Sequence, residues 1–158
     1  MQVVNPLNRI QNWLLQLNVD SYFCDHCNAI HLPHLQDRNN IHHTKIEVID
    51  DALALTITSN ITPQAILMLV SELCQINKST TFVKVFMDVE ADSDLAQIKF
   101  VHSLFYSDDL TFEQFSLVFT RFEEESLELI EELANCDMIA DSKLKMINNG
   151  SNHRTTYH

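Results

Sequence analysis

The sequence predicts an α+β domain in which a mainly antiparallel sheet of about five strands is flanked by three helices. Three observations support this prediction. Segments with apolar residues at helical spacing occur near both ends and in the middle of the chain. Segments that alternate apolar and polar residues lie between them, and two pairs of these segments are each joined by a short acidic link rather than by a long helical stretch. The predicted order is therefore α-β-β-β-α-β-β-α.

The first helix is predicted to begin at Asn5, a favourable N-cap, with Pro6 at the first helical position. One apolar stripe follows at helical spacing, formed by Leu7, Ile10, Trp13, Leu14 and Leu17. Residues 21–32 are predicted to be one extended segment with a turn near Asp25 and His26. The polar residues 33–43 are predicted to form a loop.

Two alternating runs, residues 44–49 and 52–58, flank Asp50 and Asp51 and predict a tight hairpin. A second helix is expected to follow, with Thr62 as its cap and Pro63 at its first position. Ile61 is placed to pack onto Ile66 as a hydrophobic staple. The buried stripe of this helix is expected to comprise Ile66, Leu69, Val70 and Leu73.

Residues 80–89 and 96–106 also alternate at period two, and the acidic link with Glu90, Asp92 and Asp94 is expected to turn between them. The last helix begins with a predicted capping box of Thr111 and Gln114, and Leu110 is placed to pack onto Phe115. Its apolar face comprises Phe112, Phe115, Phe119, Phe122, Leu129 and Leu133. We therefore expect one domain over residues 1–140 and a polar, flexible tail over residues 141–158.

The net charge of −12, with 10 basic and 22 acidic residues, argues against direct nucleic-acid binding, because that affinity depends on cations that neutralise phosphates. A single glycine excludes a glycine-rich phosphate loop. No apolar run is long enough for a membrane span, and the N-terminus lacks the pattern of a signal peptide. We therefore expect a cytoplasmic protein with reduced cysteines that makes no direct contact with nucleic acid or membrane.

One stretch, FCDHCNAIHLPH at residues 23–34, carries the spacing C-x2-C-x3-H-x2-H. Its ligand types suit tetrahedral zinc, and the candidate ligands are Cys24, Cys27, His31 and His34. The spacing is much tighter than that of a zinc finger, so a strand and turn without metal is the preferred interpretation. In that interpretation Ile30 and Leu32 face the core while Ala29 and His31 face away. A thiol redox pair is a third interpretation.

Other polar side chains are weaker candidates. His42 and His43 could add metal ligands, although surface residues that titrate near neutrality are commoner. His102 lies in a strand and is expected to be a hydrogen-bonded core or interface residue rather than a catalytic base. The glutamates of the last helix are expected to form a solvated face: Glu123, Glu124, Glu125, Glu128, Glu131 and Glu132. Six phenylalanines are expected to be core, or a partner-binding surface where exposed: Phe100, Phe105, Phe112, Phe115, Phe119 and Phe122.

Residues 13–36, WLLQLNVDSYFCDHCNAIHLPHLQ, resemble the start of the YbjN family of bacterial sensory transduction regulators. KIEVIDDALALTIT, SELCQINKSTTFVKVFMDVE and LTFEQFSLVF resemble later parts of the same family in the same order, so the resemblance covers roughly residues 5–140. It implies a fold similar to type III secretion chaperones and a role in regulating stress responses, motility and exopolysaccharide. It implies no enzymatic activity and supplies no catalytic or binding residues.

The leading hypothesis is a non-enzymatic bacterial regulator, without a cofactor, that acts by contact with a partner protein or peptide. Either a sheet edge would take an extended peptide or an exposed patch would take a helix. Homodimer formation is compatible with the sequence. The alternative hypothesis is a zinc- or redox-responsive sensor that uses Cys24, Cys27, His31 and His34.

Overall fold

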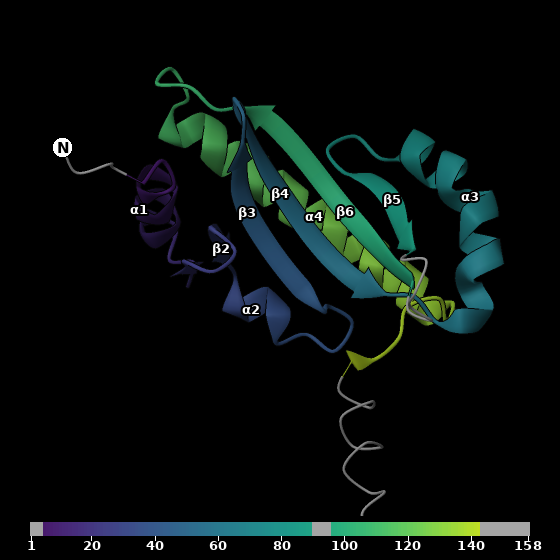
Figure 1. Cartoon of the computed structure of the whole chain (residues 1–158). Helices are drawn as coiled ribbons and strands as arrows, with labels where there is room; N and C mark the ends of the chain where they lie inside the picture. Colours follow the sequence, from purple (N-terminus) through teal and green to yellow (C-terminus); the bar gives the residue numbers. More distant parts are fainter. Residues whose placement is uncertain (1–4, 90–95, 143–158) are drawn as a thin grey trace, which may run out of the picture.

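The computed structural model describes residues 5–89 and 96–142 (Figure 1). The acidic link at residues 90–95 and the tail from residue 143 onward, on which two expectations fell, lie outside the described residues. The elements are α1 (Asn8–Gln16), β1 (Tyr22–Cys24), β2 (Ala29–His31), α2 (Pro33–Gln36), β3 (His43–Ile49), β4 (Ala52–Asn60), the 3-10 turn η1 (Pro63–Ala65), α3 (Ile66–Ser79), β5 (Lys84–Val89), β6 (Ala96–Phe105) and α4 (Phe112–Asn135). None of the helices in these ranges is long and apolar enough to cross a bilayer.

All strands pair antiparallel in one sheet of order β1-β2-β3-β4-β6-β5. The predicted α+β class is therefore confirmed, and so is the hairpin at Asp50, whose φ of 53° places it in the left-handed region of a tight turn. α3 makes the crossover that carries the chain from β4 past β6 to the edge strand β5.

The numbers of strands and helices differ from the prediction, because the described residues form six strands and four α-helices. Residues 21–32 are two short strands rather than one extended segment, since the chain reverses at a turn where Asn28 adopts a φ of 52°. The predicted loop at residues 33–43 contains α2, because Pro33 occupies its first turn, where a missing N–H has no consequence.

Within residues 5–89 and 96–142, one face of the sheet is covered and the other is open. α4 runs along the covered face, and α1 packs on it through contacts of Trp13 with Phe112 and Phe115 (Figure 1). The core between these layers is contributed by the inward residues of β3, β4 and β6, including Ile46, Leu53, Leu55, Ile57, Ile98 and Phe100. The opposite face carries a shallow hollow lined by alternate residues of the same strands, among them Lys45, Thr56 and Lys99.

Three predictions about the helices need correction. Thr62 does not cap α3, because the 3-10 turn η1 comes first and the Thr62 hydroxyl donates to the carbonyl oxygen of Asp137. α1 begins at Asn8 rather than at Pro6, because Pro6 and Leu7 form a turn that precedes the regular helix. Asn5 caps this turn, since its side chain accepts a hydrogen bond from the Leu7 N–H and its carbonyl oxygen accepts one from the Asn8 N–H. In α3 the predicted stripe is too wide, since Leu69 is buried but Val70 is exposed. α3 packs beside the edge strand β5 rather than over the centre of the sheet, so a narrower face meets the core.

α4 confirms the predicted capping box of Thr111 and Gln114.

The hydroxyl of Ser126 on α4 is buried and has no hydrogen-bond partner among the described residues. An unsatisfied buried hydroxyl destabilises the folded state, and alanine has the higher helix propensity. We therefore expect Ser126→Ala to raise the free energy of unfolding by about 0.5–1.5 kcal/mol, measured by urea denaturation. Ser116→Ala on the same helix, at a half-buried position, should change it by a few tenths. A loss of stability in Ser126→Ala would show that this hydroxyl is satisfied in solution.

Candidate metal centre

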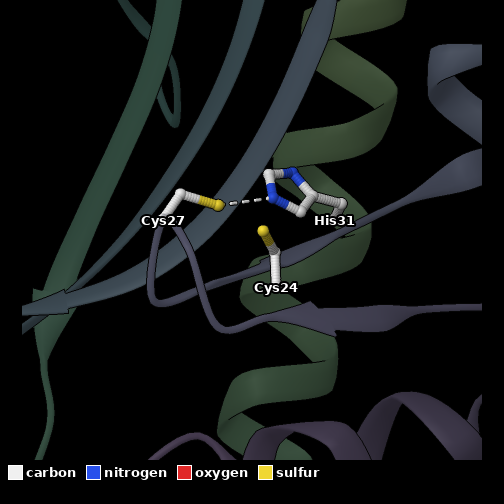
Figure 2. Close-up of side chains that lie close together, drawn as sticks. All are labelled: Cys24, Cys27 and His31. Carbon is white, nitrogen blue, oxygen red and sulfur yellow. Dashed lines mark hydrogen bonds between the residues drawn. The ribbon is translucent and has the colours of Figure 1, made fainter.

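The candidate ligands gather in the β1–β2 hairpin, at one edge of the sheet. Cys24 ends β1 and pairs with Ala29, Cys27 lies in the turn, and His31 ends β2 opposite Tyr22. This hairpin reverses the chain within a few residues, so it brings the three side chains to one place although they are spread over eight positions of sequence. Their ligand atoms all lie within 4.8 Å of one another (Figure 2).

His31 is the fixed member of this cluster. Its ring is buried, and Nδ1 lies 2.6 Å from the carbonyl oxygen of Thr44 on β3. A carbonyl can only accept, so Nδ1 carries the proton and Nε2 has the free lone pair in the neutral ring. Nε2 lies 2.9 Å from the Sγ atom of Cys27. The lone pair of His31 is thus directed at the Cys27 sulfur, as in a histidine ligand oriented by an outer hydrogen bond.

The Thr44 carbonyl is itself held in place. The Thr44 hydroxyl accepts a hydrogen bond from the Leu32 N–H at 2.9 Å and donates one to the Gln36 side chain at 2.8 Å. These bonds join β2, α2 and β3 around a threonine that is completely buried. Ile30 and Leu32 lie in the hydrophobic core, as expected, whereas His31 lies on the other side of β2 against Tyr22 and His43. Ala29 and His31 are nevertheless buried.

The two thiols differ in acidity. The backbone N–H of Cys27, together with its side chain, stabilises the Cys24 thiolate and lowers the pKa of Cys24 below its ordinary value. The same side-chain hydrogen bond raises the pKa of the Cys27 thiol, and desolvation raises it further. Cys24 is therefore the thiol that ionises more readily, and the thiolate is the form that binds metals.

His34, the fourth predicted ligand, is not brought to the cluster. It lies on α2, and its Nε2 is 3.1 Å from a carboxylate oxygen of Glu123 on α4. The structure instead places His43 beside His31, with ring centroids 4.8 Å apart. Burial lowers the pKa of His43, and the neighbouring His31 lowers it further. His42 lines the hollow on the open face of the sheet, close to His43.

Two other predictions about polar residues have clear outcomes. His102 is a hydrogen-bonded strand residue, as expected, with Nδ1 2.6 Å from the carbonyl oxygen of Phe82. The glutamates of α4 are not simply a solvated face. Glu125 accepts hydrogen bonds from the backbone N–H groups of Thr81, Phe82 and Val83 at 2.6–2.9 Å, and Glu123 contacts His34. Neither contact follows from the helical pattern, because both partners lie far away in sequence.

The fold and this cluster define a small α+β protein with a one-sided antiparallel sheet and a cysteine–histidine hairpin at its edge. A family model described as "Putative bacterial sensory transduction regulator" matches residues 6–135. The chain therefore belongs to the YbjN family, as the sequence resemblance predicted. The YbjN proteins of Escherichia coli strain K12 and of Shigella flexneri are each 33% identical over 137 residues, which are 87% of this chain and 85% of each relative.

Two solved structures have a similar fold. The crystal structure of YbjN from E. coli has a TM-score of 0.81 at 30% identity and covers 86% of this chain and 96% of that one. A protein from Methanothermobacter thermautotrophicus has a TM-score of 0.50 at 10% identity, with 84% and 99% of the two chains covered. The second similarity concerns the fold alone. The family description supports a regulatory class for this chain.

Proposed function

We propose that this chain is a non-enzymatic regulatory protein of the bacterial cytoplasm that binds an amphipathic helix of a partner protein in the groove between α3 and α4. One observation carries the proposal. Of the fourteen residues of α3, all of which the structure describes, Leu69 alone is buried. α3 is therefore a helix whose apolar side chains exceed what the core of this chain can cover.

Sheet edges are the weaker alternative for a peptide site. The outward N–H and C=O groups of Val85 on β5 are both bound by the side chain of Asn77, at 2.7 and 2.9 Å. At the other edge, β1 is only three residues long. Covered and very short edge strands resist the addition of another strand. The sequence suggested two binding modes, an extended peptide at a sheet edge and a helix on an exposed patch. The second mode, a helix in a groove, is therefore favoured.

The α3–α4 groove has a volume of about 340 Å³. Its apolar lining includes Met68 and Ile76 of α3, Leu133 of α4, and Met138 beyond α4, and its acidic lining includes Glu72 and Glu132. Methionines adapt to different apolar partners, and carboxylates at the margin attract lysine and arginine. The matching occupant is a helix with one apolar face and basic flanks. A second copy of this chain fits poorly, because its net charge of −12 would repel the acidic margin.

The test uses a fluorescent helical peptide built from leucine and lysine, with one apolar face, and measures binding by anisotropy at physiological salt. We expect Met68→Gln and Glu132→Lys each to weaken binding by about tenfold, equivalent to about 1.4 kcal/mol. Leu67→Gln is the matched control for Met68, since Leu67 is 84% exposed and is not part of the groove lining. Glu124→Lys is the matched control for Glu132→Lys. Glu124 lies outside the groove, and both substitutions change the net charge by the same amount.

Equal effects of the groove and control variants would reduce the interaction to general charge attraction and contradict the proposal. Binding of a leucine–glutamate peptide with the same affinity would do so as well. Self-association that Met68→Gln abolishes, seen by sedimentation, would make a second copy the occupant. If the proposal holds, a photoreactive residue at position 68 should crosslink in cells to an amphipathic helix with basic flanks. The same residue at position 67 should not.

A further inference from the structure

We propose that Cys24, Cys27 and His31 form a zinc site with three protein ligands and a fourth position open to water or to an external donor. The proposal is independent of the helix-binding groove, because β1 and β2 lie at the edge of the sheet opposite to β5 and α3. It also differs from the four-ligand set that the sequence spacing suggests. Two thiolates and an imidazole are donors that zinc prefers.

The distances within the cluster are close to those of a zinc site. Bond lengths of about 2.3 Å to sulfur and 2.0 Å to nitrogen place tetrahedral donors about 3.5–3.8 Å apart. Here all three donor atoms lie within 4.8 Å of one another, and the Cys27 Sγ to His31 Nε2 distance is 2.9 Å. The hairpin therefore already holds the three donors near the separations of a tetrahedral site, and the Cys27 Sγ atom must move away from His31 Nε2 to admit the metal.

His31 supplies the second observation. A buried histidine whose Nδ1 is fixed by a carbonyl has one lone pair left, and here that lone pair is directed at the Cys27 Sγ atom (Figure 2), with the Cys24 Sγ atom within 4.8 Å. Metal-binding histidines are commonly oriented in this way by an outer hydrogen bond. A disulfide between Cys24 and Cys27 would need an external oxidant and would leave this nitrogen without a role. The convergence of three donors therefore favours a metal over a redox pair.

The fourth position is open because His34 is committed elsewhere. Its ring lies on α2 against Glu123 of α4, and it is not among the side chains that converge on the cluster. Cys24 and Cys27 are each half-buried, so solvent can reach the side of the cluster away from β3. Zinc sites with three protein ligands keep such a position for water or for an incoming donor.

The test begins with the untagged full-length protein. We expect one zinc per chain by elemental analysis, and a visible and near-ultraviolet spectrum of tetrahedral thiolate ligation after replacement by cobalt. Cys24→Ser and Cys27→Ser should each weaken zinc binding beyond the roughly 10–100-fold loss that follows removal of an outer hydrogen-bond partner. Cys136→Ser and Cys74→Ser are matched controls, because both residues are exposed cysteines outside the cluster. They should leave the affinity unchanged.

His34→Ala separates the three-ligand site from the four-ligand one. We expect it to leave both the zinc affinity and the cobalt spectrum unchanged, whereas a comparable loss to that in Cys24→Ser would overturn the three-ligand geometry. Added zinc should raise the Tm of the metal-free protein, because a ligand that binds the folded state stabilises it. No zinc in the purified protein together with no rise in Tm would overturn the site, as would zinc that is retained in Cys24→Ser. Cobalt that fails to bind after full reduction of the thiols would leave only the redox pair.

Discussion

Replacing Phe115 by alanine is expected to lower the free energy of unfolding by about 3–5 kcal/mol. The Phe115 ring is completely buried, and its centroid lies 5.5 Å from that of Trp13 and 5.7 Å from that of Phe119. It therefore joins α1 to the first turns of α4. Removal leaves a cavity that two helices held by other contacts can close only in part. Urea denaturation followed by circular dichroism measures the loss, with an unchanged m-value as evidence that the unfolding transition is comparable.

Phe105→Ala is the matched control. Phe105 ends β6 and is 87% exposed, so its removal should change the free energy of unfolding by no more than about 0.5 kcal/mol. Similar losses in both variants would contradict this assignment of the core. Burial separates the six phenylalanines that the sequence left undecided between core and surface. Four of the six phenylalanines are core, Phe112 is half-buried against Trp13, and Phe105 alone of the six is largely exposed.

The long elements could be predicted because their patterns are local. α1, α4 and the β3–β4 hairpin each have a sustained apolar period or a turn that residue types reveal. β1, β2 and α2 could not be separated in the same way, since each has only three or four residues. Their boundaries depend on the positive φ of Asn28 and on the hydrogen bond from the Leu32 N–H to the hydroxyl of Thr44, which lies on β3. The exposure of Val70 was also missed, because the width of a buried helical face depends on which elements surround the helix.

The candidate site, like the fold, could be predicted only where its residues lie close together in the sequence. Cys24, Cys27 and His31 lie within one hairpin, so their spacing in sequence approximates their spacing in space. His34 follows Pro33, and the new helix that begins there turns it toward Glu123, a residue 89 positions away. The sequence contains no signal for that pair or for the contacts of Glu125. A spacing motif therefore indicated the chemistry, and long-range packing determined which donors converge.

Glu125→Ala is expected to lower the free energy of unfolding by about 2–3 kcal/mol, because hydrogen bonds to a charged group contribute about 1.5–3 kcal/mol each and these are partly exposed. One carboxylate oxygen accepts from Thr81 and the other from both Phe82 and Val83. These three residues connect α3 to β5. The variant leaves their N–H groups without the acceptor, and the N–H of Val83, a buried residue, has the poorest access to water.

Glu124→Ala is the matched control, since the Glu124 side chain is 60% exposed and its contact with Arg121 spans 3.7 Å. An exposed ion pair of that kind contributes less than about 1 kcal/mol. Hydrogen exchange should locate the difference: amides 81–83 should exchange faster in Glu125→Ala and not in Glu124→Ala. Equal exchange in both would show that the contacts of Glu125 are dispensable. α3 buries little of its own surface, so the bonds of Glu125 to Thr81–Val83 and of Asn77 to Val85 hold it beside the sheet. Faster exchange at residues 81–83 should therefore be accompanied by weaker peptide binding in the α3–α4 groove, although Glu125 is not part of its lining.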